Sequence, residues 1–159
     1  MRIHQPAASR RRLVACAWVM GLVLSAVSAT GAQSLSVSGS PAALKITTAS
    51  AGSPPNAAVN SATTYTVTVR NKNQPQKITA QLDAAMPTGT TLTIDLSPVT
   101  KSTSVGPVDL ATTPQDLVVD VVNTSSRTAG ITYTFNASSG AGVVPSSFRT
   151  VTFTLLAFP

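Results

Sequence analysis

The feature that most constrains the fold of this chain is an alternation of apolar and hydroxyl side chains that recurs in one segment after another. Tyr65, Val67 and Val69 alternate with threonines, and residues 131–136 and 150–155 repeat the pattern. Successive side chains of a β-strand point to opposite faces, so this period of two gives each strand one apolar face and one hydroxyl face. Threonine suits the outer face because its branched β-carbon fits a pleated, half-exposed surface. The pattern predicts an all-β protein.

About eight or nine strands are expected, separated by clusters of Gly, Pro, Asn and Ser at spacings typical of a sandwich. Their core-facing residues are expected to be Leu35 and Val37; Leu44 and Ile46; Tyr65, Val67 and Val69; Ile78, Ala80 and Leu82; Leu92, Ile94 and Leu96; Val108 and Leu110; Leu117, Val119 and Val121; Ile131, Tyr133 and Phe135; and Val151, Phe153 and Leu155. No segment after residue 32 keeps a period of 3.6. Two antiparallel sheets with one apolar face each bury those faces by packing together, so the sequence predicts an antiparallel β-sandwich.

The first 32 residues match the pattern of a secretory signal peptide. Four arginines precede an apolar run of fifteen residues, 13–27, and the small residues 30–32 precede an expected cut before Gln33. An uncleaved membrane anchor is the alternative, but a helix of that length spans about 22 Å, less than the roughly 30 Å hydrocarbon core. We expect a signal helix over residues 1–32, a single sandwich domain over residues 33–159, and export to the periplasm, cell surface or exterior. General secretion and the twin-arginine route both stay open.

Cleavage before Gln33 removes the only histidine (His4), the only cysteine (Cys16) and the only tryptophan (Trp18). The remaining chain lacks the Ser/His/Asp and Cys/His nucleophile systems and the usual zinc ligands. Its seven Lys and Arg against five Asp give a net charge of +2, and these cations are scattered singly. Nucleic-acid binding is therefore not expected, and contact with a membrane is expected only through an uncleaved leader. We expect no enzymatic activity and no cofactor.

The remaining candidates for chemistry are weak. Asp116 and Asp120 are expected on one face of a strand, but about 13 Å apart, too far for a pair of catalytic carboxylates. Lys101 lies in a Ser- and Gly-containing loop and lacks the apolar surroundings that activate a lysine. Sugar binding commonly uses exposed aromatic rings. Phe148 and Phe158 are the aromatic residues outside the expected core faces, and we expect each to plug a strand end.

Three segments resemble parts of bacterial surface proteins. Met86-Pro87-Thr88-Gly89-Thr90-Thr91-Leu92 resembles the Pro-x-Gly-Thr turn before a strand in their Ig-like domains. Residues 149–155, which close on Phe158-Pro159, are similar to the terminal strand of secreted fimbrial-subunit and spore-coat-U-like proteins, and residues 33–38 resemble a donor strand. The resemblance implies an Ig-like sandwich that docks through its terminal strands.

Outer faces made of hydroxyls rather than charges leave the edge strands poorly protected against pairing with another chain. We therefore expect an exported, non-enzymatic structural or adhesive surface protein that self-assembles or docks on a surface partner by edge-strand addition. The residues expected in the docking strands are Leu35, Val37, Val151, Phe153, Leu155 and Phe158. A secreted module that binds carbohydrate or another ligand is the alternative. Whether the terminal strands are donated or paired internally stays open.

Overall fold

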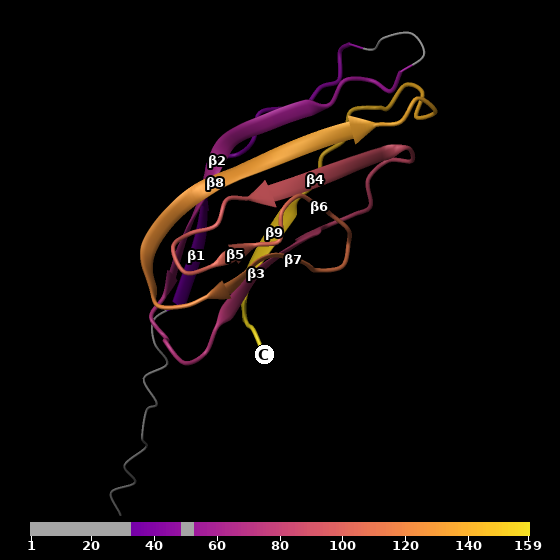
Figure 1. The fold of residues 1–159 in the computed structure, drawn as a ribbon. Helices are drawn as coiled ribbons and strands as arrows, with labels where there is room; N and C mark the ends of the chain where they lie inside the picture. The colour runs from indigo at the N-terminus through magenta and orange to yellow at the C-terminus, as the bar shows by residue number, and fades with distance from the viewer. Residues whose placement is uncertain (1–32, 49–52) are drawn as a thin grey trace, which may run out of the picture.

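Nine β-strands and no helix make up the described part of this computed structural model, residues 33–48 and 53–159 (Figure 1). The strands are β1 (Gln33–Ser38), β2 (Ala58–Val69), β3 (Gln76–Leu82), β4 (Thr90–Leu96), β5 (Thr103–Ser104), β6 (Val108–Asp109), β7 (Gln115–Val121), β8 (Thr124–Ala137) and β9 (Val151–Ala157). The signal helix expected over residues 1–32 lies outside the described residues. The expected cleavage before Gln33 and the single-domain division stay predictions.

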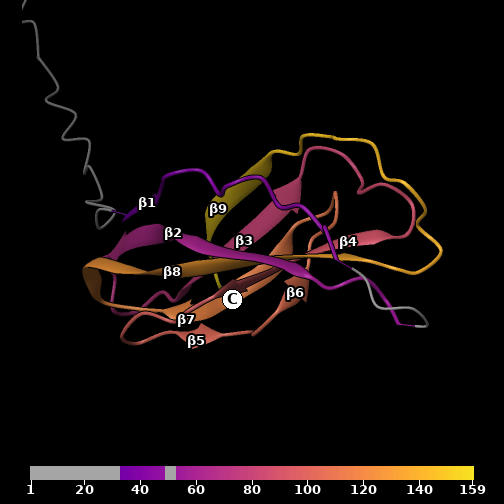
Figure 2. The same ribbon diagram turned by 90° about the horizontal axis from the view of Figure 1, so that it is seen from above.

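The strands form two antiparallel sheets, which confirms the β-sandwich predicted from the alternation. The five-stranded sheet has the order β1-β2-β8-β4-β6 and the four-stranded sheet the order β5-β7-β3-β9. β8, with 14 residues, is the longest strand and curves along the first sheet beside β2 (Figure 1). Viewed from above, β1 and β9 lie on one side of the molecule and β5 and β6 on the other (Figure 2). Each side of the sandwich is therefore formed by a different pair of edge strands.

The core consists of the inward-facing residues of both sheets. The buried apolar residues are Tyr65, Val67, Val69, Ile78, Ala80, Leu82, Leu92, Ile94, Leu96, Val99, Leu110, Leu117, Val118, Val121, Ile131 and Tyr133. Most of them are residues that the alternation places inward. Fully burying a large aliphatic side chain contributes about 1.5–3 kcal/mol, so a core of this size suits a domain without disulfides. Phe135, Leu35 and the expected core residues of β9 are only partly buried. Val37 is exposed, so its expected place in the core is wrong; it lies in β1, an edge strand at the rim of the sandwich.

β7 departs from the expected alternation. Leu117 and Val118 are both fully buried, whereas Val119, expected in the core, is only half-buried. The register of β7 against β3 shifts twice, and Asp120 adopts a φ of 57°. Each bulge inserts an extra residue and changes the face to which the next side chain points. The expectation for Val119 is therefore wrong because two bulges interrupt the period of two.

The prediction of a strand at Leu44 and Ile46 is also wrong. Residues 39–48 contain no strand, although both side chains are half-buried and Leu44 packs against the core. Gly39, at a φ of 74°, follows directly after β1. The alternation at Leu44 and Ile46 thus reflects partial burial, but the segment forms no hydrogen-bonded ladder with a neighbouring strand. Conversely, β5 was not expected, because two residues are too few to show a period.

Candidate strand-docking surface

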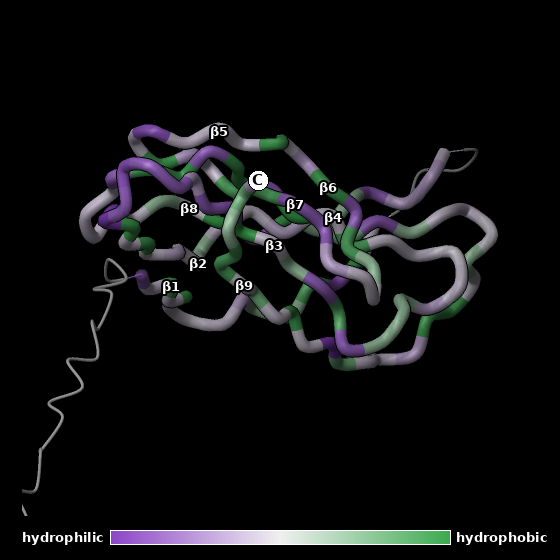
Figure 3. The backbone as a smooth tube through the Cα atoms, turned by 90° about the horizontal axis from the view of Figure 1, so that it is seen from below, coloured by the Kyte–Doolittle hydropathy of each residue, from purple (hydrophilic) through white to green (hydrophobic). Residues whose placement is uncertain are grey.

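β1 and β9 are the outermost strands of the two sheets, and they lie next to each other on one side of the sandwich (Figure 3). β1 pairs with β2 over six consecutive positions, and β9 pairs with β3 over seven, both without a register shift. Both terminal strands are thus paired internally on one flank. On the other flank, each presents a backbone edge that no described strand covers.

The hydrogen bonds at the two ends of β9 determine which backbone groups face this open edge. The Phe158 amide donates to the Pro75 carbonyl at 2.9 Å, and the Asp83 amide donates to the Thr150 carbonyl at 3.1 Å. Residues of an antiparallel strand alternate between those that bond to one neighbour and those that face away from it. Even-numbered residues of β9 therefore bond to β3, and the amides and carbonyls of its odd-numbered residues face the open edge.

The six residues expected in the docking strands all lie along these edges. Leu35 in β1 and Val151, Phe153 and Leu155 in β9 are half-buried and pack against the core. Val37 is 38% exposed. Phe158 follows β9 and is half-buried. The core is therefore less completely covered between β1 and β9 than in the middle of the sandwich.

The edge strands on the opposite side of the sandwich are short, and one of them carries a charge. They are β5 and β6, of two residues each, and β6 carries Asp109. Short strands and charged side chains are devices that keep sheet edges from pairing with other chains. β1 and β9 are six and seven residues long and contain no charged residue, proline or glycine. Only the β1–β9 side therefore lacks these protections.

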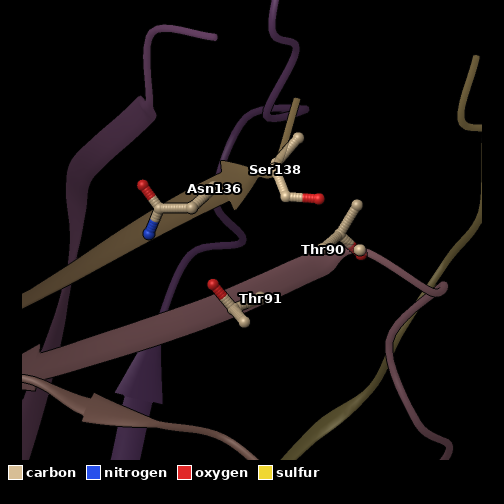
Figure 4. A pocket seen from close by; sticks show the side chains of 6 residues that line it. Thr90, Thr91, Asn136 and Ser138 are labelled. Carbon is tan, nitrogen blue, oxygen red and sulfur yellow. The ribbon is translucent and has the colours of Figure 1, made fainter. Parts of the chain in front are cut away.

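A shallow hollow of about 430 Å³ lies where β4 begins and β8 ends. In Figure 4, the side chains of Thr91 and Asn136, which are directly paired across the two strands, lie close together. Gly89 in the turn before β4 has a φ of 78°, and a β-carbon there would lie 2.9 Å from Cα of Ala141. The turn that resembles the Pro-x-Gly-Thr motif thus packs closely on the loop after β8. The residues lining the hollow supply hydroxyls and one amide but no titratable or aromatic group.

Several aspartates have structural partners. Asp116 forms an ion pair with Lys77, with Nζ 3.0 Å from Oδ1. Asp109 accepts a hydrogen bond of 2.6 Å from the Thr93 hydroxyl, and Asp83 accepts one of 3.0 Å from the Thr150 amide. Within residues 33–48 and 53–159, no group of three or more potential metal-binding side chains occurs. The same ranges contain no helix long and apolar enough to cross a membrane.

Phe148 does not plug a strand end, which corrects that expectation. It is 93% exposed in the loop between β8 and β9, where Val143 is 99% exposed. The next residue, Arg149, donates from Nε to the Ala85 carbonyl at 2.9 Å and from Nη1 to the Phe148 carbonyl at 2.7 Å. The backbone beside the exposed ring is thus anchored to the loop after β3. The sequence pattern missed this feature because a loop has no period that indicates which way a side chain points.

No protein-family model, curated protein or solved structure matches this chain. The likeness to fimbrial-subunit and spore-coat-U-like proteins therefore depends on residues 33–38 and 149–155 alone. The candidate site is defined by the geometry of β1 and β9 alone.

Proposed function

We propose that this chain is an exported, non-enzymatic structural or adhesive surface protein whose Ig-like sandwich accepts a strand of a neighbouring molecule at an open sheet edge. The observation that carries the proposal is the pair of long, uncharged edges on one side of the sandwich, β1 and β9. In strand addition, the backbone hydrogen bonds provide affinity, and side chains at alternate positions provide specificity. The half-buried apolar residues of both edges supply those alternate positions.

β9 is the stronger acceptor of the two strands. Its sequence, VTFTLLA, combines β-branched and aromatic residues with no charge, proline or glycine, a composition typical of segments that pair between chains. Its outward-facing amides belong to Val151, Phe153, Leu155 and Ala157, so a second strand has a regular ladder to join. We propose a second copy of this chain as the partner. Pairing of β9 with β9 closes a dimer, whereas pairing of β9 with β1 of the next copy continues into a fibre.

A charge on the outer face of β9 tests this proposal. Thr154 is exposed, and its side chain points away from the core. We expect Thr154→Lys to weaken self-association of the exported protein at least tenfold, because lysine on an edge strand opposes pairing with a partner strand. Analytical ultracentrifugation over a concentration series measures the association constant.

The matched control is Thr134→Lys, on the outer face of β8, which has a neighbouring strand on both sides. This variant keeps the association of the natural chain, although it carries the same added charge. A natural chain that stays monomeric at the highest soluble concentration contradicts the proposal. So does an equal loss of association in the two variants.

A secreted carbohydrate-binding module is the second candidate function, and the exposure of Phe148 favours it. An exposed aromatic ring beside an anchored backbone provides a surface on which a sugar ring can stack. We expect Phe148→Ala to abolish binding to any glycan that the natural chain retains on a glycan array. Val143→Ala is the control, because it removes an equally exposed side chain that has no ring. An array without a bound glycan excludes this second function.

A further inference from the structure

A second depression lies at the opposite end of β8 from the hollow beside Gly89, between the loop after β4 and the turn from β7 to β8. It encloses about 170 Å³ and is lined by Thr100, Lys101, Asn123, Thr124, Ser125 and Arg127. Two of these residues are cationic and none is acidic. The depression is thus a small, positively charged pocket.

Arg127 occupies a position where the strand pattern expects a core residue. It pairs with the fully buried Val67 of β2 and lies two residues before Ala129, which packs against the core. Residues directly opposite each other in an antiparallel pair lie on the same face of the sheet. Arg127 is nevertheless exposed, in a run of four exposed residues between the buried Thr124 and the half-buried Ala129 of β8. An arginine therefore lines the pocket from the inner face of the sheet, at the end of the sandwich.

Lys101 is held on the other wall of the pocket by its backbone. Its carbonyl accepts a hydrogen bond of 3.2 Å from the Val122 amide, and the Thr100 carbonyl accepts one of 3.2 Å from the Thr124 hydroxyl. Lys101 and Asn123 have φ angles of 64° and 44°. A non-glycine residue in this left-handed region is strained and persists only where the surroundings hold it. The pocket is thus built on a tethered backbone.

The residues that line the pocket include no carboxylate. The ion pair found in the described part of the chain joins Lys77 and Asp116 on the four-stranded sheet, away from this pocket. Further positive charge comes from the loop between β2 and β3, which contains Arg70 and Lys72. This loop is joined to the pocket by a hydrogen bond of 3.3 Å from the Asn123 amide to the Asn71 carbonyl. The end of the sandwich therefore attracts anions.

We propose that this pocket binds a phosphate group. Its volume of about 170 Å³ is about six times the roughly 30 Å³ that a water molecule occupies in the liquid, which suits one tetrahedral oxyanion with part of its hydration. The guanidinium of Arg127 can donate two parallel hydrogen bonds, and Lys101 adds a second positive charge. The side-chain amide of Asn123 and the hydroxyl of Ser125, both in the pocket lining, complete a set of donors.

Two sources can supply the phosphate, a small soluble anion or the headgroup of an anionic lipid. The geometry suits the lipid source, because Gln33 pairs with Val69 at the same end of the sandwich as the pocket. Any membrane segment that precedes Gln33 therefore joins the domain at this end.

NMR titration of the ¹⁵N-labelled exported protein with inorganic phosphate, at constant ionic strength, tests the site. We expect saturable shifts confined to the amides of residues 100–102 and 122–127. Arg127→Gln weakens binding at least tenfold, as expected for loss of a charge-assisted pair of hydrogen bonds, and Arg127→Lys weakens it less. Lys45→Gln, which removes an exposed cation outside the pocket, leaves binding unchanged.

Cosedimentation with phosphatidylglycerol or phosphatidylcholine vesicles separates the two sources. Binding to phosphatidylglycerol vesicles that Arg127→Gln abolishes assigns the lipid headgroup, whether or not free phosphate binds. Phosphate shifts without vesicle binding assign a soluble anion. The proposal fails if neither probe binds, or if Arg127→Gln and Lys45→Gln reduce binding equally, because the effect is then one of overall charge.

Discussion

At the scale of single residues, Tyr65 shows how one buried polar group connects strands that are not neighbours. Its side chain is fully buried, and its hydroxyl donates a hydrogen bond of 2.6 Å to the Ser97 carbonyl just after β4. β2 and β4 are separated by β8, so this bond spans the width of a strand beneath the sheet. Burial raises the pKa of Tyr65 from 10.0 to about 12 and also raises the pKa of Tyr133.

These shifts predict a loss of stability at alkaline pH. The folded protein favours the neutral phenol, whereas unfolding returns the pKa of Tyr65 to 10.0. The contribution to stability is therefore complete below pH 10 and is lost as the pH rises towards 12, by about 2–3 kcal/mol. About half of this loss, roughly 1.4 kcal/mol, is expected by pH 11. Urea unfolding at pH 8 and pH 11 measures it as a difference in the free energy of unfolding.

Tyr65→Phe is the informative variant for this prediction. At pH 8 it is expected to be less stable than the natural chain by about 1–2 kcal/mol, because the part-buried hydrogen bond to the Ser97 carbonyl is lost. Its stability then falls less between pH 8 and pH 11, with the remaining fall coming in part from Tyr133. Equal alkaline losses in both proteins contradict a raised pKa of Tyr65.

At the scale of elements, β7 and β9 illustrate two outcomes of the same apolar pattern. β9 keeps a continuous register with β3, and its expected inward residues are those that pack against the core. β7 contains two register shifts against that same strand. A central strand must match both neighbours, and β5 and β3 flank β7. The bulges place Leu117 and Val118 together in the core, which a strict period of two does not allow.

Alanine substitutions in β7 test this arrangement. Val118→Ala is expected to lower the free energy of unfolding by about 1.5–3 kcal/mol, because the side chain is fully buried and its removal leaves a cavity. Val119→Ala is expected to cost less than about 1 kcal/mol, since the side chain is only half-buried. Chemical denaturation of the two single variants compares the costs. A larger loss of unfolding free energy for Val119→Ala than for Val118→Ala places Val119 in the core, as an uninterrupted alternation would, and contradicts the bulged strand.

At the scale of the whole molecule, the two sides of the sandwich differ in how their edge strands are protected against pairing with another chain. The protected side has the short edge strands β5 and β6, and the unprotected side has the longer edge strands β1 and β9. Both open edges lie on the flank where the core is only partly covered. The proposed pairing between copies along one flank depends on this asymmetry.

Hydrogen exchange measured residue by residue tests the open flank directly. In dilute protein, the amides of Thr152, Thr154 and Leu156 are expected to be protected because they bond to β3, while those of Phe153 and Leu155 exchange rapidly. On self-association, protection of Phe153 and Leu155 should rise at least tenfold, because a partner strand then accepts their hydrogen bonds. Assembly that leaves these two amides exposed excludes β9 as the docking strand.

The sequence by itself determined the strand class, the sandwich and most core faces, because the period of two is a local property of the extended backbone. It also identified the uncharged terminal strands. Only the tertiary structure decided that these strands are neighbouring edges, that β7 is bulged, that Leu44 and Ile46 lie outside any strand, and that Phe148 is exposed. It also brought Lys101 and Arg127 into one pocket from separate segments. These features depend on which strands become neighbours, and an alternation within one strand carries no information about its neighbours.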